Sequence, residues 1–127
     1  MSTFFVHLQI VPVDKIGASI IRLPAACTIT RATFYVSNES YRPYRLSNKV
    51  ALFAGNAATW QDTGTQVSEC VHLVGVELQQ PLIEITNFAS WSNTGNFNAG
   101  DMLFLRYCDD SACKACYVQA TLEFTTV

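Results

Sequence analysis

Charge is what this sequence has little of. Asp, Glu, Lys and Arg make up 14% of its 127 residues, where soluble globular chains usually have about 25%. The formal net charge is −2, and the 8 basic residues are scattered along the chain, so no basic surface for a phosphate backbone is expected. We therefore expect no nucleic-acid partner. A charge-poor surface indicates contact with other protein subunits, although an apolar core shared by two sheets would lower the charged fraction too.

Long apolar runs and a targeting signal are also missing. No stretch approaches the ~20 consecutive apolar residues that cross a bilayer, so no membrane partner is expected. Residues 1–7 lack the basic start and the small-residue cleavage site of a secretory signal. The sequence predicts a protein that begins near residue 1 and is made in a cytoplasm.

Enzyme motifs are missing as well. The chain contains no G-x-S-x-G turn, no H-E-x-x-H and no phosphate-binding G-x-x-x-x-G-K-[ST] loop. We predict no enzymatic activity, no cofactor and no metal. Its carboxylates are scattered, and because spacing along a chain does not fix spacing in space, a small glycoside-cleaving or metal-dependent enzyme remains an alternative.

Alternating strands are what the sequence does contain. In residues 116–125, apolar side chains occupy one parity and polar side chains the other, which is typical of a strand with one dry and one wet face. No segment shows helical periodicity with caps. The sequence predicts a single all-β domain over residues 1–127, a jelly-roll-like antiparallel β-sandwich of about eight strands. The expected strands are residues 4–11, 19–23, 28–37, 49–54, 67–78, 81–88, 102–108 and 116–125.

Three of the five cysteines lie close together near the C-terminus. Cys108, Cys113 and Cys116 have the spacing C-x4-C-x2-C, which is also found in plant-type iron–sulfur proteins with a fourth ligand further along. A zinc site completed by Cys70 or His72 is a second alternative. We favour a third interpretation, in which residues 102–108 and 116–125 form a hairpin and a disulfide joins Cys108 to Cys116, with Cys113 as competitor.

The remaining cysteines are expected to be buried free thiols. Cys27 and Cys70 both lie within or beside predicted strands. An odd total of 5 leaves at least one thiol unpaired within a single chain. A disulfide would persist only if the protein reaches an oxidising exterior after synthesis.

Aromatic and arginine side chains gather in the predicted loops. Tyr, Trp and Arg are the residue types that anchor protein interfaces, and exposed rings also stack on sugars. The structural alternative is that Trp60 and Trp91 fill the open ends of the sandwich. The predicted interface residues are Tyr41, Arg42, Tyr44, Arg45, Trp91 and Phe97.

The C-terminal third resembles β-sandwich virion proteins of tailed bacteriophages, of the capsid decoration or cement type. In that pattern a penultimate strand begins A-G-D-x-L-x-L-R, passes an acidic loop and returns as an alternating terminal strand. Here the three parts are AGDMLFLR at residues 99–106, CDDS at 108–111 and YVQATLEF at 117–124. The opening LPAACTI at residues 23–29 is also similar, whereas the clustered cysteines depart from the pattern.

This resemblance implies a role on the capsid exterior. The expected function is that of a bacteriophage structural protein, a homotrimer that bridges subunits of the major capsid protein as cement. The alternative is a carbohydrate- or receptor-binding module of a tail fibre or baseplate, with Tyr41, Tyr44 and Trp91 as stacking platforms. The first strand could also pair with a neighbouring chain, and Arg106 is expected to pair with acids of the neighbouring sheet.

Overall fold

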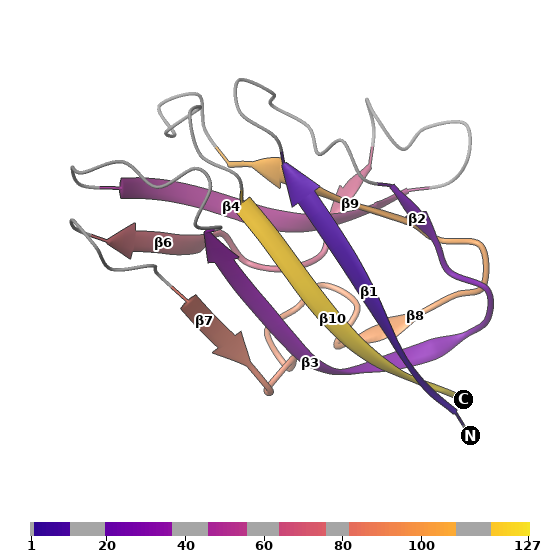
Figure 1. The fold of residues 1–127 in the computed structure, drawn as a ribbon. Coiled ribbons are helices and arrows are strands. Elements are labelled where there is room, and N and C mark those ends of the chain that lie inside the picture. Colours follow the sequence, from indigo (N-terminus) through magenta and orange to yellow (C-terminus); the bar gives the residue numbers. More distant parts are fainter. Residues whose placement is uncertain (1, 11–19, 37–45, 56–63, 76–81, 109–117) are drawn as a thin grey trace.

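The computed structural model describes residues 2–10, 20–36, 46–55, 64–75, 82–108 and 118–127 (Figure 1). These residues form strands, turns and bends, and none of them lies in a helix. No described segment is therefore an apolar helix of membrane-spanning length. The prediction of an all-β chain is confirmed.

Ten strands follow one another along the described chain, several of them only two residues long. Their bounds are β1 Thr3–Ile10, β2 Ile21–Arg22, β3 Cys27–Val36, β4 Leu46–Gly55, β5 Thr65–Gln66, β6 Val71–Gly75, β7 Leu82–Ile85, β8 Asn96–Phe97, β9 Met102–Tyr107 and β10 Val118–Thr126.

The strands form two sheets, in which every described pairing is antiparallel. The first sheet has the order β1-β10-β3-β7, with β8 added to β3. The second has the order β2-β9-β4, after which both β5 and β6 pair with β4. Consecutive strands lie in the same sheet only from β4 to β6 and from β7 to β8, and every other pair of consecutive described strands is divided between the two sheets. This is jelly-roll topology, so the predicted fold class is confirmed.

Strand β10 has the predicted dry and wet faces. Val118, Ala120, Leu122 and Phe124 have no exposed surface, while the residues between them are half-buried. The strand lies between β1 and β3, at the centre of its sheet (Figure 1). Its apolar face therefore contributes to the middle of the core between the two sheets.

The predicted hairpin of the last two long strands is wrong. β9 pairs with β4 and β2 in the second sheet, whereas β10 belongs to the first. Neighbouring strands of a sequence usually lie side by side, but each sheet of a jelly roll takes strands from distant parts of the chain. The connection from β9 to β10 crosses the sandwich instead of turning back within one sheet.

The segment between β7 and β9 closes one end of the sandwich. The Asn96 N–H donates to the Asn93 carbonyl at 3.0 Å, and the two residues between have positive φ, 52° at Thr94 and 87° at Gly95. Two successive positive φ values define a type I′ turn. The Gly95 carbonyl then accepts a hydrogen bond from the Ile29 N–H at 2.9 Å. This turn is thereby fastened to β3 of the first sheet.

Candidate interaction surfaces

The predicted interface residues separate into two groups. Tyr41, Arg42, Tyr44 and Arg45 lie outside the described residues. Trp91 and Phe97 are described, and each exposes only 3% of its surface.

The rings of Trp91 and Phe97 pack inside the sandwich. Trp91 meets Phe88 edge-on, with ring centroids 4.7 Å apart, and Phe97 meets Phe124 edge-on at 5.4 Å. Both rings belong to the core cluster. Trp91 therefore lies where the structural alternative put it, filling an end of the sandwich. A ring enclosed in this way has no free face on which a sugar can stack.

The cysteine pairing differs from the prediction. The disulfide joins Cys108 to Cys70, whose Cα atoms are 6.2 Å apart, and not to Cys116. Cys70 is also exposed and not the buried free thiol that was expected. The error follows from the wrong hairpin, because Cys108 directly follows β9 of the second sheet. Cys113 and Cys116 lie outside the described residues.

This disulfide joins segments next to two strands that pair with β4. Cys70 precedes β6 and Cys108 follows β9, and both strands pair with β4. Two strands that flank a third lie about 9.6 Å apart in a flat sheet. At a Cα separation of 6.2 Å the two segments therefore converge beside β4. The Cys108 N–H also donates to the Lys49 carbonyl of β4 at 2.8 Å, which fixes this end of the second sheet.

Cys27 is the free cysteine among the described residues, and it is buried as predicted. Burial raises the pKa of its thiol, and the negative charge of Asp101 raises it further. The thiol is therefore protonated at neutral pH and poorly nucleophilic. Within the described ranges, no three His, Cys, Asp or Glu side chains are placed to hold a metal ion.

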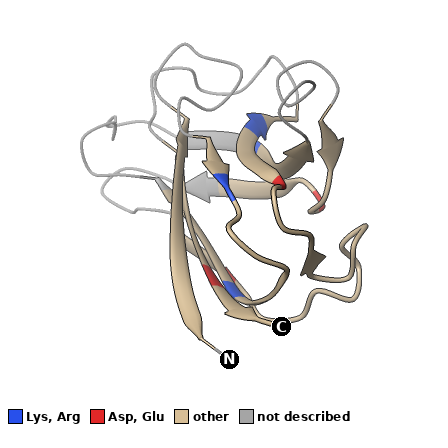
Figure 2. Cartoon of the chain, turned by 90° about the vertical axis from the view of Figure 1, so that its right-hand side faces the viewer, with Lys and Arg blue, Asp and Glu red and all other residues tan. Residues whose placement is uncertain are grey.

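The outer face of the first sheet is largely polar and rich in threonine, with few charges and with the exposed apolar side chains Phe5 and Leu82 on its two edge strands. Arg31 and Glu84 form an ion pair at 3.6 Å, and the Thr30 hydroxyl donates to the Glu123 carboxylate at 2.6 Å. Figure 2 shows how sparse charged residues are along the described ribbon. Two rows of side chains cross this face, His7-Thr121-Thr33-Glu84 and Gln9-Gln119-Tyr35-Leu82.

The outer face of the second sheet is apolar in its middle. Phe104 alternates with the core residues Leu103 and Leu105, yet it has no exposed surface. Its ring stacks on Phe53 at 5.6 Å, and the Arg106 guanidinium lies over the Phe53 ring at 5.7 Å. Arg106 thus makes a cation–π contact with an aromatic ring of its own sheet. The predicted pairing of Arg106 with acids of the neighbouring sheet stays a prediction.

A groove of about 300 Å³ lies where β6 and β7 border the open side of the sandwich. Both apolar and polar side chains line it. Its lining residues are Glu69, Cys70, Val71, His72, Ile83, Ile85, Asn87, Ser90 and Trp91.

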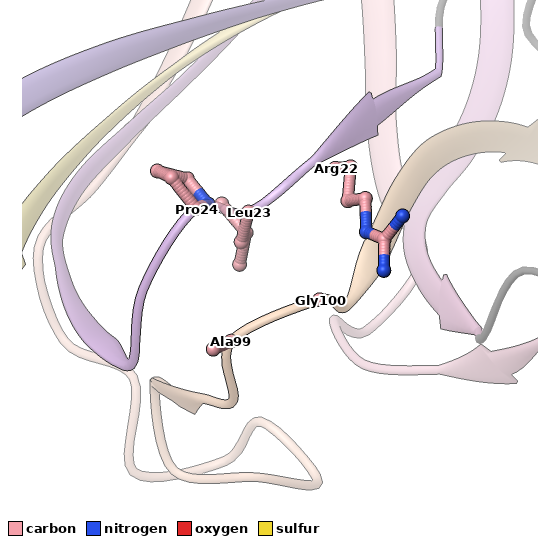
Figure 3. Close-up of a pocket in the computed structure, with 5 residues that line it drawn as sticks. All are labelled: Arg22, Leu23, Pro24, Ala99 and Gly100. Atoms are coloured by element: carbon pink, nitrogen blue, oxygen red, sulfur yellow. The ribbon is translucent and has the colours of Figure 1, made fainter.

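A second hollow, of about 380 Å³, lies beside β2 (Figure 3). Arg22, Leu23 and Pro24 line one side of it, and Ala99 and Gly100 line the other. Gly100 has φ 87° and donates its N–H to the Leu23 carbonyl at 2.8 Å. Arg22 is the one charged residue in this lining, and the other four residues have apolar side chains or none, so the hollow offers no set of groups for catalysis.

The fold is similar to that of a viral capsid chain. In the solved capsid of Ralstonia phage GP4, one chain matches with a TM-score of 0.60 and 9% sequence identity, over 99% of this chain and 85% of that chain. A chain of the virus-like particle of Macrobrachium rosenbergii extra small virus matches over 99% and 80% at 9% identity, but its TM-score of 0.37 gives that likeness no weight. No family model and no curated protein matches the sequence. At such identity the likeness concerns the fold alone.

Proposed function

We propose that this chain is a structural protein of a bacteriophage virion, bound to the outside of the capsid as a cement that bridges major capsid subunits. The observation that carries the proposal is the match to a chain of a phage capsid over 99% of this chain and 85% of that chain. The resemblance of residues 99–124 to phage decoration proteins supports the same role independently. We also propose that the protein is a homotrimer, as that resemblance implies.

Charge and redox chemistry support a position on the exterior. A net charge of −2 with scattered basic residues suits a surface that does not face the genome. The disulfide between Cys70 and Cys108 joins an exposed residue to a half-buried one. Disulfides persist in oxidising surroundings, which the outside of a released particle provides.

Cement function requires interface area at low desolvation cost. Neutral polar surface costs less free energy to dehydrate than charged surface does, and Tyr and Arg side chains anchor such contacts. In this proposal the segment that contains Tyr41, Arg42, Tyr44 and Arg45 supplies the anchors. The polar face of the first sheet contributes little of its own charge to oppose an approaching subunit.

Copy number in purified particles tests the proposal. We expect copies comparable to the number of shell subunits when intact particles are quantified by mass spectrometry. Adding the purified chain to particles that lack it should raise the temperature at which they release their genome. A few copies per particle, or none, would contradict a cement role and indicate a tail position or a non-structural protein.

A pair of variants locates the contact. Replacing both tyrosines, Tyr41→Ala with Tyr44→Ala, should lower occupancy on particles at least tenfold, whereas Thr33→Ala on the first sheet should leave it unchanged. Equal occupancy of both variants would show that the tyrosines are not the anchors.

A further inference from the structure

Strand β1 is an edge strand without the usual protection. Within the described part of the chain it pairs on one side only, with β10. Edge strands are normally guarded by charges, proline, bulges or short length. The eight residues of β1, TFFVHLQI, contain no proline and no Lys, Arg, Asp or Glu. Their register with β10 runs without a shift from Thr3 to Ile10.

The hydrogen-bonding groups on the open side of β1 can be identified from the ladder. The Thr126 N–H donates to the Ser2 carbonyl at 2.8 Å, so Ser2 turns its backbone groups toward β10. In an antiparallel ladder these groups alternate along the strand between the two sides. Pointing away from β10 are therefore the N–H and C=O groups of Thr3, Phe5, His7 and Gln9.

Incompletely covered aromatic rings lie on both faces of this edge. Phe5 exposes 58% of its surface on the outer face. On the core face Phe4 is only partly buried, although its ring stacks on Phe124 at 5.3 Å. An added strand would cover both rings, and burial of apolar area favours association by about 25 cal/mol per Å² before the costs of binding.

We propose that β1 pairs antiparallel with β1 of a second copy of this chain, about a twofold axis at Val6. This register places Thr3 opposite Gln9 and Phe5 opposite His7 of the other copy. It is the register in which every outward N–H and C=O of one strand finds a partner in the other. On the core side it brings Phe4 next to Leu8 of the other copy.

A second copy of β1 suits this edge better than β7 does, the strand at the other edge of this sheet among the described residues. β7 has only four residues, so it cannot satisfy an eight-residue strand, and it carries the charged Glu84. Two β1 strands match in length and carry no charge that could repel in self-pairing. Identical surfaces meeting about a twofold axis also form a closed contact, not a growing filament.

The contact goes beyond the proposed cement function, because it joins copies of this chain to each other and not to the shell. Within a threefold assembly, a twofold contact links one trimer to the next. Each link is modest, but many copies on one surface would reinforce each other through high effective concentration.

Deleting the strand is not a clean test of the proposal. Val6, Leu8 and Ile10 are buried in the core, so loss of residues 1–11 would unfold the first sheet. Substitutions at the exposed residues Phe5 and His7 leave the core face intact. We therefore compare like-charge and opposite-charge variants of these two positions on the oxidised full chain.

Sedimentation equilibrium provides the readout. The wild-type mass should be twice that of the variant Phe5→Glu with His7→Glu, which sets carboxylates against each other in both symmetry-related pairs and should weaken association at least tenfold. The variant Phe5→Glu with His7→Lys should restore the wild-type mass, since it sets opposite charges together in the proposed register. The matched control Leu82→Glu, on the opposite edge, should not change the mass. Thermal midpoints verify that all variants fold.

Three results would overturn the proposal. They are an unchanged mass in the like-charge variant, failure of the opposite-charge variant to recover the wild-type mass, and loss of association in Leu82→Glu, which would indicate β1-to-β7 rings. None of these results bears on binding to the shell, because occupancy on particles is measured separately.

Discussion

The two sheets of this sandwich differ in how their outer faces are stabilised. Each has one face on the shared core, but their outer faces differ in character. The first sheet is polar outside, with threonines and two satisfied carboxylates, Glu84 and Glu123. The second buries Phe104 and Ala51 completely on its outer side and is fastened by a disulfide.

The difference shows that stability is distributed unequally between the layers. The first sheet depends on the core and on its long central strand β10. The second has additional stabilisation outside the core, from stacked rings and from a covalent bond.

The largest expected effect separates the two outer faces directly. Phe104→Ala removes a fully buried ring and should lower the free energy of unfolding by about 3–5 kcal/mol. Thr121→Ala, on the outer face of the first sheet, removes a hydroxyl within 3.0 Å of His7 Nδ1 and should cost about 1 kcal/mol or less. Urea denaturation of the two variants measures both values. Similar losses would show that the faces are equivalent.

A somewhat smaller effect is expected from the disulfide of the second sheet. The bond closes a separation of 38 residues, for which the chain-entropy model gives about 4 kcal/mol, while measured losses are typically about 2–4 kcal/mol. The paired variant Cys70→Ser with Cys108→Ser should show this loss in urea. Adding reductant to the wild type should reproduce it, and should not destabilise the paired variant further. A wild type indifferent to reductant would contradict the pairing.

The smallest expected effect is the difference in stability between alanine variants of two glycine turns, one bonded to each sheet. Gly95 and Gly100 have the same φ of 87°, so alanine carries the same backbone penalty at both, about 1–2 kcal/mol. At Gly95 the new Cβ would also meet Ile29 Cγ2 at 3.1 Å and Phe88 Cβ at 3.2 Å, whereas at Gly100 it would meet only Arg22 Nη2 at 3.9 Å.

Gly95→Ala should therefore destabilise more than Gly100→Ala, by about 1 kcal/mol. Thermal unfolding of the two single variants measures this packing contribution, since the two glycines have the same φ. If Gly100→Ala is the more damaging of the two, then the turn beside β2 constrains the chain more tightly than its open surroundings indicate.

The sequence predicted the fold class but not how its strands are distributed between sheets. The alternation of Val118 to Phe124 identified β10, because one of its faces is dry and the other is wet. In β9 the residues Leu103, Phe104 and Leu105 are all buried, so alternation is absent there. With no pattern to choose its neighbour, β9 was assigned to the strand nearest in sequence, and the wrong disulfide followed.

The prediction that Trp91 and Phe97 lie in exposed surface loops failed for a different reason. Trp91 and Phe97 stand among Ser, Asn and Gly, a composition typical of surface loops. The turn at Thr94 and Gly95 instead folds this segment back over the end of the sandwich. Phe97 is held in place by the pairing of Asn96 and Phe97 with β3, and a two-residue strand leaves no periodic signal in a sequence.

The chain ends at almost the same point where it starts. The two ends lie side by side (Figure 1), and the bonds between them include one from the Thr126 N–H to the Ser2 carbonyl at 2.8 Å and one from the Ser2 N–H to the Thr126 hydroxyl at 2.9 Å. A short peptide could therefore join the two ends and new ends be opened elsewhere, the arrangement that circular permutation requires. A foreign epitope fused to either end would project from a single corner, which makes this domain a natural scaffold for display.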